Sequence, residues 1–267
     1  MELGGRRVVV TGGASGIGRA MCLRFAELGA AVTVADRDEP GAGATAAAIT
    51  GAGGRAAAQR CDVRREADLV ELVRRATATF GPIDLFCSNA GVAAGGGADA
   101  PDEVWTLAWE VHAMAHVWAA RAVLPGMLER GEGYLLHTAS AAGLLTNLGA
   151  APYAVTKHAA VAFAEWLAIT YGDAGIKVSC LCPQGVRTPL LMEASDDIAG
   201  AVVLASGELL EPQQVADAVV AGLAAEHFLI LPHPIVADYW RAKTTDYDRW
   251  LGGMRRLQAR LGGTRTA

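Results

Sequence analysis

Residues 7–28 read RVVVTGGASGIGRAMCLRFAEL: a β-branched run, a glycine-rich turn and an amphipathic segment. This order predicts a strand over 7–11 and a helix over 17–28. Glycines permit a tight turn and a close approach of phosphate oxygens, and the first helical turn offers free N–H donors. Gly12, Gly16 and Gly18 depart from the common G-x-G-x-x-G spacing, so the glycines alone also fit a flexible turn. The flanking strand and helix favour a pyrophosphate site.

The same alternation of β-branched runs and helical stripes continues along the chain. Further strands are predicted over 31–35, 57–61, 83–88, 134–138, 177–182 and 228–231. Helices are predicted over 43–50, 66–80, 103–130, 153–171 and 212–225, the long one broken near Pro125. Strand–helix alternation of this kind predicts an α/β fold: a doubly wound, parallel, seven-stranded Rossmann-like sheet with helices on both faces. We expect one domain over 1–232 and a C-terminal extension over 233–267 that forms an interface or caps a pocket.

Composition excludes several classes of protein. The 267 residues are 52% apolar and 19% charged, which supports a large core and excludes disorder. The net charge of −5 gives no basic surface for nucleic acid. No signal peptide is apparent, and the uncharged stretch 138–156 contains Pro152 and several glycines, so we expect no membrane segment. The odd count of five cysteines, without a disulfide-framework spacing, favours a cytoplasmic protein with buried thiols over a metal or redox site at Cys180 and Cys182.

Asp36 ends the second predicted strand, 18 residues after Gly18, where a ribose-binding carboxylate is expected. Such a carboxylate accepts hydrogen bonds from ribose hydroxyls and repels a 2′-phosphate. It therefore favours NAD over NADP, although the neighbouring Arg37 is suited to bind that phosphate. The simpler interpretation of Asp36 is a solvated strand end.

From residue 5 to about 232, the sequence resembles the short-chain dehydrogenase/reductase family of the single-domain type. The motifs that carry the resemblance are Thr11-Gly12…Gly16-Ile17-Gly18, Asp62-Val63, Ser88-Asn89-Ala90-Gly91, Ser140, Tyr153-x-x-x-Lys157 and Pro183…Val186…Thr188.

The resemblance implies how most of these residues would contact the cofactor. It places Asp62, beside Val63, at the adenine and the loop Asn89-Ala90-Gly91 along the cofactor. Pro183, Val186 and Thr188 would lie at its nicotinamide end. The family has glycine after this proline, whereas this chain has Gln184. NADP-dependent members often carry Arg or Lys where this chain has Ser15, which again favours NAD.

The catalytic group is predicted to be Ser140, Tyr153 and Lys157. Tyr153 and Lys157 are four residues apart on a predicted helix and so share one face. A lysine cation beside a phenol lowers its pKa, which would let Tyr153 exchange a proton with an alcohol or ketone. Ser140 is placed to hydrogen-bond the same substrate oxygen. The resemblance also implies that Lys157 binds the nicotinamide ribose. In isolation such a pair would be an ordinary surface pair; Ser140 and the cofactor motifs favour a site.

His112 lies thirteen residues before Pro125, where the family usually has asparagine. The family residue's backbone carbonyl is thought to hold a water that connects the lysine to solvent, and any residue supplies a carbonyl. We hypothesise a modest proton-relay or positioning role for His112. His116, one turn later, makes a metal pair conceivable, but no third ligand is apparent, so no metal is predicted.

The sequence thus predicts an NAD-dependent oxidoreductase acting on a secondary alcohol or ketone. The substrate is expected to be partly apolar, because the stretch 188–210, which resembles the family's substrate loop, contains Leu190, Leu191 and Met192. The resemblance implies a homotetramer or homodimer. Alternatives are a non-catalytic dinucleotide sensor or scaffold on the same fold, and an epimerase or dehydratase, which usually needs a larger C-terminal domain.

Overall fold

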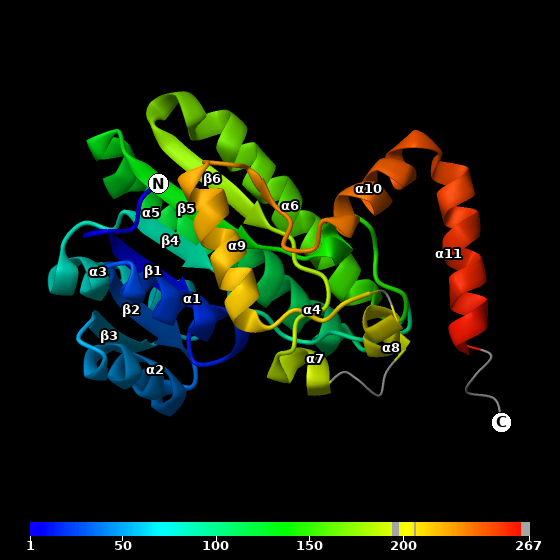
Figure 1. Ribbon diagram of the computed structural model, residues 1–267, viewed down its shortest axis with the longest axis horizontal. Coiled ribbons are helices and arrows are strands. Elements are labelled where there is room, and N and C mark those ends of the chain that lie inside the picture. The colour runs from blue at the N-terminus through cyan, green and yellow to red at the C-terminus, as the bar shows by residue number, and fades with distance from the viewer. Residues whose placement is uncertain (194–197, 206, 263–267) are drawn as a thin grey trace.

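The computed structural model describes residues 1–193, 198–205 and 207–262. Its centre is a seven-stranded parallel sheet in the order β3-β2-β1-β4-β5-β6-β7, which confirms the predicted fold (Figure 1). The strands are β1 (Arg7–Thr11), β2 (Ala31–Asp36), β3 (Arg55–Arg60), β4 (Leu85–Ser88), β5 (Gly133–Thr138), β6 (Ile176–Leu181) and β7 (Leu229–Ile230). The order reverses beside β1, where β1 pairs with both β2 and β4, and such a switch point opens a crevice at the carboxyl ends of the strands.

Helices connect the strands and extend the chain beyond them. They are α1 (Gly16–Glu27), α2 (Glu39–Gly51), α3 (Glu66–Phe80), α4 (Asp102–Trp109), α5 (Ala115–Arg130), α6 (Ala151–Tyr171), α7 (Pro189–Glu193), α8 (Ile198–Ala205), α9 (Pro212–Ala224), α10 (Ile235–Thr245) and α11 (Tyr247–Gly262). Short turns of other helix types are η1 (Glu110–Met114), η2 (Ala141–Gly143) and η3 (Gly172–Ala174). The helix α2 begins four residues before its predicted start at 43, because the Asp38 side chain caps it by accepting a hydrogen bond from the Gly41 N–H.

Side chains alternate between two cores along the strands. Val9 of β1 and Leu135 of β5 join the core under α3, α5 and α6. Val8 and Val10 join the core under α1, α2 and α9. A parallel sheet covered on both faces requires this nearly continuous apolar sequence in its strands.

The predicted break near Pro125 is wrong. The helix α5 runs through Pro125, and the irregular turn is instead the π-helical η1. Proline removes one helical hydrogen bond, but the neighbouring Val123, Leu124 and Met127 are buried in the core and hold the helix in place. The π turn adds one residue to the helix and buries His112 within it.

The segments on the substrate side contain more helix than the sequence analysis expected. The stretch predicted as a loop over 188–210 contains α7 and α8, while 194–197 and 206 lie outside the described residues. The extension beyond 232 forms two helices, and α11 descends beside α8 (Figure 1). No helix in the described part of the chain is long and apolar enough to cross a membrane.

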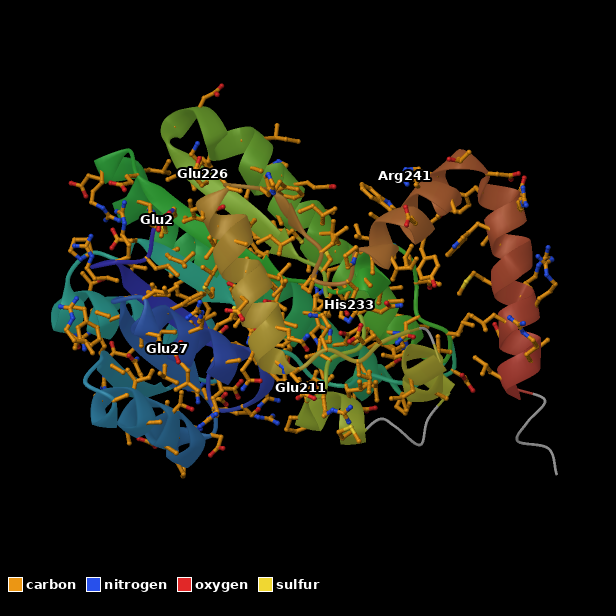
Figure 2. All side chains as sticks on the ribbon, viewed as in Figure 1. Glu2, Glu27, Glu211, Glu226, His233 and Arg241 are labelled. Carbon is orange, nitrogen blue, oxygen red and sulfur yellow. The ribbon has the colours of Figure 1, made fainter. Side chains whose placement is uncertain are left out.

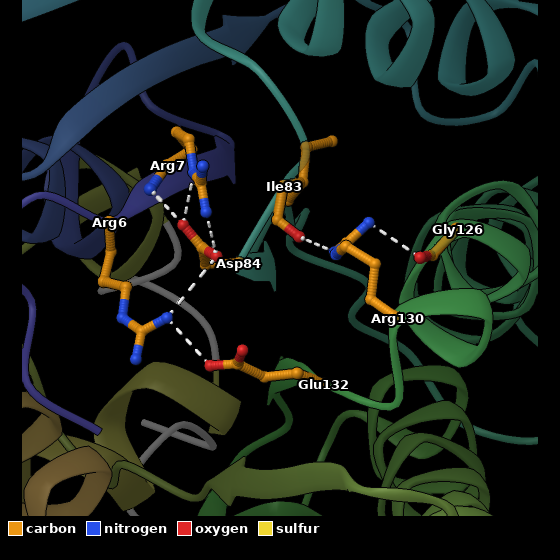
Figure 3. Close-up of polar contacts among 7 residues, drawn as sticks. All are labelled: Arg6, Arg7, Ile83, Asp84, Gly126, Arg130 and Glu132. Carbon is orange, nitrogen blue, oxygen red and sulfur yellow. Dashed lines mark hydrogen bonds and ion pairs between the residues drawn. The ribbon is translucent and has the colours of Figure 1, made fainter.

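Asp84 joins the amino ends of β1 and β4, the edge of the sheet opposite the crevice (Figure 3). Its carboxylate accepts hydrogen bonds from the Arg7 backbone N–H at 2.8 Å and from Arg7 Nε at 2.6 Å, and it lies 3.6 Å from the Arg6 guanidinium. Burial raises the pKa of Asp84, but the hydrogen bonds and charge of Arg7 outweigh burial and leave that pKa below its usual value.

We expect Asp84→Asn to lower the free energy of unfolding by about 2 kcal/mol, because a buried charge-assisted contact is lost. Urea unfolding at pH 7 measures this. Because the folded-state pKa of Asp84 is depressed, its contribution is present at pH 7 and declines as the pH falls below about 4. A variant as stable as wild type at pH 7 would contradict this role.

Candidate active site

A cavity of about 1120 Å³ opens at the carboxyl ends of the strands, from the glycine turn to α11. Of the predicted site residues, only His112 does not line it. Those that line it are Gly12, Ser15, Gly16, Ile17, Gly18, Asp36, Arg37, Asp62, Val63, Asn89, Ala90, Gly91, Ser140, Tyr153, Lys157, Pro183, Val186 and Thr188. Residues from seven separate segments therefore meet around one space.

In the glycine turn, the backbone lies too close to neighbouring backbone atoms to leave room for side chains. Gly12 has a φ of +70°, and a Cβ atom there would lie 2.9 Å from the Cα of Ala90. A Cβ on Gly18 would lie 2.0 Å from the Gly12 carbonyl oxygen, so neither position accepts a side chain. Ser15 caps α1 without using its hydroxyl, and the first N–H groups of α1 have no acceptor within the helix. The turn therefore fits the pyrophosphate of a dinucleotide.

Two carboxylates line the next part of the cavity. Asp36 accepts hydrogen bonds from the Ala14 and Asp38 N–H groups, both at 3.0 Å, which fixes its orientation while leaving other lone pairs free. Asp62 is held by Arg64, whose Nη2 lies 2.7 Å from Oδ2. The hydrogen bonds from Arg64 lower the pKa of Asp62 below its usual value.

A chain of buried and half-buried hydrogen bonds links the strand ends to Lys157. Thr11 Oγ1 accepts from the Asn89 N–H at 2.9 Å, and Asn89 Nδ2 donates to the Thr11 carbonyl at 3.1 Å. Thr138 Oγ1 donates to Asn89 Oδ1 at 3.1 Å, and Lys157 Nζ donates to the Thr138 carbonyl at 3.0 Å. Asn89 thus ties β1 to β5 through its side chain.

Tyr153 and Lys157 share the inner face of α6. The Lys157 ammonium lies 5.6 Å from the centroid of the Tyr153 ring. Ser140 caps η2: its Oγ accepts from the Ala142 N–H at 3.1 Å, and it lies 3.4 Å from the Pro183 carbonyl. A Cβ on Gly143 would lie 2.5 Å from the Lys157 carbonyl, so η2 and α6 pack directly against each other.

The pKa values of these groups follow burial. Burial raises the pKa of Tyr153, and the hydrogen bond with Ser140 opposes that rise only in part. The predicted lowering of the Tyr153 pKa by Lys157 is therefore wrong for these residues by themselves. Burial lowers the pKa of Lys157 to about 8, so this amine titrates close to neutral pH.

His112 is fully buried beside Tyr153, with ring centroids 5.2 Å apart. Its Nε2 accepts from the Val92 N–H at 3.1 Å, so the proton of a neutral ring sits on Nδ1, which lies 3.0 Å from Thr156 Oγ1. Burial lowers the pKa of His112 well below 6.5. A neutral ring with both nitrogens engaged connects the loop after β4 to α6, and this geometry favours positioning over proton transfer.

His116 does not pair with His112. Its Nδ1 lies 2.8 Å from Nδ1 of His137 in β5, and both rings are buried. Among the described residues, no three His, Cys, Asp or Glu side chains are grouped to hold a metal ion. All five cysteines are free and buried, with Cys180 and Cys182 sulfurs 3.8 Å apart.

Two groups of residues were not among the predicted site residues, although the second belongs to the extension that was predicted to form an interface or cap a pocket. His233 pins the unusual Gln184-Gly185 turn: the Gln184 N–H donates to Nδ1 at 3.2 Å, and Nε2 donates to the Gly185 carbonyl at 3.0 Å. Figure 2 places His233 between the body of the protein and the C-terminal helices. The second group comes from α10, α11 and the residue between them, which supply Tyr239, Ala242, Asp246, Arg249, Trp250, Gly253, Met254, Arg256 and Leu257 to the cavity wall. No short motif marks either group in the sequence.

Comparison with known proteins agrees with this geometry. The family model of the short chain dehydrogenases matches residues 6–199. A 1-deoxy-11-beta-hydroxypentalenate dehydrogenase from Streptomyces exfoliatus is 40% identical over 195 residues, covering 72% of this chain and 71% of that protein. A 2,5-dichloro-2,5-cyclohexadiene-1,4-diol dehydrogenase from Sphingobium indicum is 36% identical over 228 residues, covering 82% of this chain and 90% of that protein.

A solved structure supports the same assignment. The crystal structure of a short chain dehydrogenase/reductase from Burkholderia phymatum in complex with NAD superposes with a TM-score of 0.86 at 30% identity, covering 93% of this chain and 96% of that one. From its sequence motifs, its sheet and the residues that meet in its cavity, this chain belongs to the short-chain dehydrogenase/reductase family, whose members are dinucleotide-dependent oxidoreductases acting on CH–OH groups.

Proposed function

We propose that this protein is an NAD-dependent dehydrogenase that interconverts a secondary alcohol and a ketone, with Tyr153 as the acid/base. The observation that carries the proposal is the meeting of Ser140, Tyr153 and Lys157 with the glycine turn in one cavity. The relatives named above are dehydrogenases of hydroxylated compounds, which supports CH–OH chemistry.

The residues around the cavity fit an extended dinucleotide. The first turn of α1 would hold the pyrophosphate and Asp36 the adenosine ribose. Asp62 and Val63 would lie at the adenine, and Asn89, Ala90 and Gly91 along the cofactor. Pro183, Val186 and Thr188 would lie at the nicotinamide. Bound there, NAD would accept the hydride from the alcohol carbon.

Side chains of the protein transfer the proton and stabilise its donor and acceptor. Tyr153 takes the hydroxyl proton as the alcohol is oxidised, and returns it in the reverse direction. Ser140 hydrogen-bonds the same oxygen. The Lys157 amine, anchored to the Thr138 carbonyl and with a pKa near 8, is available to stabilise the phenolate and to contact the nicotinamide ribose.

The substrate is proposed to be partly apolar. Beyond Ser140 and Tyr153, the cavity wall includes an apolar set made of Leu145, Leu190, Leu191, Val202, Val203, Trp250, Met254 and Leu257, beside the charged Asp246, Arg249 and Arg256. Apolar walls with few polar groups are typical of sites for apolar ligands.

We also propose that the protein assembles as a homodimer or homotetramer through α5 and α6. On α6, Val155, Trp166 and Ile169 are exposed at helical spacing, and Ile169 is 84% exposed. An apolar stripe of this kind is typical of an interface between subunits.

Tyr153→Phe should lower turnover by about 10²–10⁴-fold, because the group that transfers the proton is lost. NADH affinity, measured by fluorescence titration, should stay within about twofold, since the ring remains. Tyr171→Phe, on the same helix outside the cavity, is the control. Near wild-type turnover in Tyr153→Phe would contradict the assignment. If wild type itself oxidises none of a panel of secondary alcohols, the alternative of a non-catalytic dinucleotide sensor would be favoured.

NAD should be preferred over NADP by at least about tenfold in kcat/KM, because the Asp36 carboxylate repels a 2′-phosphate. Asp36→Ala should reduce this preference, whereas Arg37→Met should leave NAD use unchanged. Comparing kcat/KM for the two cofactors in the three proteins checks this. Equal or better use of NADP by wild type would show that Arg37 outweighs Asp36.

His112→Asn should keep substantial activity, with kcat reduced by less than about tenfold, because asparagine retains a side chain that accepts and donates hydrogen bonds. His112→Leu should lower the free energy of unfolding by about 1–3 kcal/mol, since the buried Val92 N–H loses its acceptor. Steady-state kinetics and urea unfolding measure these effects. Complete loss of activity in a folded His112→Asn protein would show that the ring itself transfers a proton.

A further inference from the structure

Lys243 is a buried lysine on α10 that the proposed chemistry does not use. It is 7% exposed, and its Nζ donates to the carbonyls of Leu144 at 2.7 Å and Leu145 at 2.8 Å. Within the described residues it forms no salt bridge. A lysine ammonium has three protons, and two of them are used in these contacts to main-chain oxygens.

The other side of the ammonium faces two aromatic rings of α11. The Nζ atom lies 5.6 Å from the Tyr247 ring centroid and 5.1 Å from that of Trp250. The two rings are themselves 5.8 Å apart. Cation–π attraction at these distances is strongest where water is excluded, as it is around a buried lysine. One ammonium therefore contacts the turn after β5, through Leu144 and Leu145, and the start of α11.

The two carbonyls come directly after η2, the turn that Ser140 caps. The last carbonyls of a helical turn lack partners within the turn, and a lysine satisfies them well. The turn η2 also packs on the backbone of Lys157 in α6. The hydrogen bonds from Lys243 to Leu144 and Leu145 therefore hold the end of η2, the turn that sets the position of Ser140.

Two of the residues that Lys243 contacts, Leu145 and Trp250, also line the cavity. Leu145 lines it from the core and Trp250 lines it from α11, together with Ser140 and Tyr153. Lys243 itself does not line the cavity, so it acts on the site through these neighbours.

We propose that Lys243 is a positioning residue that fastens the C-terminal helices α10 and α11 to the Ser140 turn. Through this contact, in addition to the packing of α11 on α8, α11 becomes the outer wall of the substrate site and Ser140 is held in register with Tyr153. The consequence for the enzyme rests on the proposed function; the mechanical connection does not. Loss of the lysine loosens both segments at once.

Hydrogen exchange of the full-length protein, followed by mass spectrometry, tests the connection without any substrate. In Lys243→Met, a side chain of similar length without donors, peptides from 140–150 and from 235–262 should both exchange about tenfold faster, because charge-assisted hydrogen bonds are lost. The matched control is Arg241→Met. Arg241 lies on the same helix, its side chain is exposed, and its guanidinium pairs with Asp238 at 2.7 Å. It should change exchange in neither the 140–150 segment nor α11.

Kinetics test the consequence for the site. With any active alcohol, Lys243→Met should raise KM about tenfold for substrates large enough to reach α11, and lower kcat less, while NADH affinity stays unchanged. Lys243→Arg, which keeps the charge and the donors, should restore most of the KM.

Trp250→Leu covers the case in which Lys243→Met does not fold. It removes one aromatic partner and should speed exchange in α11 while leaving 140–150 protected by the remaining carbonyl contacts. Wild-type exchange rates in both segments of Lys243→Met, or equal effects in Arg241→Met, would overturn the proposal. An inactive wild type would overturn the proposed function but leave the exchange result valid.

Discussion

A single line of buried hydrogen bonds, from Thr11 through Asn89 and Thr138 to Lys157, is the constraint on which the site depends. It crosses the carboxyl ends of β1, β4 and β5, so the glycine turn and α6 are placed relative to one another by the sheet itself. Each member is a buried or half-buried polar group that is costly to leave unpaired, and this cost favours one arrangement over its neighbours. The packing of Gly143 against the Lys157 backbone extends the same constraint to Ser140.

Burial gives the site its electrostatic character. Lys157 and His112 are buried and Tyr153 is partly buried, so the charged form of each group is disfavoured: the pKa of the phenol rises, and those of the amine and the imidazole fall. The pKa values of the phenol and the amine, which are nearly equal in water, are thereby moved apart, with that of the Lys157 amine falling to about 8. Among these residues by themselves, the phenol therefore holds its proton more tightly than the amine does.

The parallel seven-stranded sheet and the position of the glycine turn were predictable, because hydrophobic period and glycine placement are local signals. Asp36 and Lys157 were singled out by their spacing and Asn89 by the family resemblance, and all three line the cavity. Three features were not predictable. The π turn at 110–114 depends on packing around His112 rather than on a breaker residue, which is why Pro125 misled the prediction. The Tyr153 pKa depends on tertiary burial. His233 and Lys243 act through backbone atoms distant in sequence, which leaves no spacing to recognise.

The family model ends at residue 199, whereas α9, α10 and α11 lie beyond it. The wall formed by α11 contacts the rest of the fold through few elements, chiefly α8 and α10. The three residues of the proposed proton chemistry, Ser140, Tyr153 and Lys157, lie far along the chain from the cavity-facing side of α11. Substitutions on that side of α11, at positions such as Met254 and Leu257, would reshape the space beyond Ser140 and Tyr153 without replacing a residue of the glycine turn or of α6.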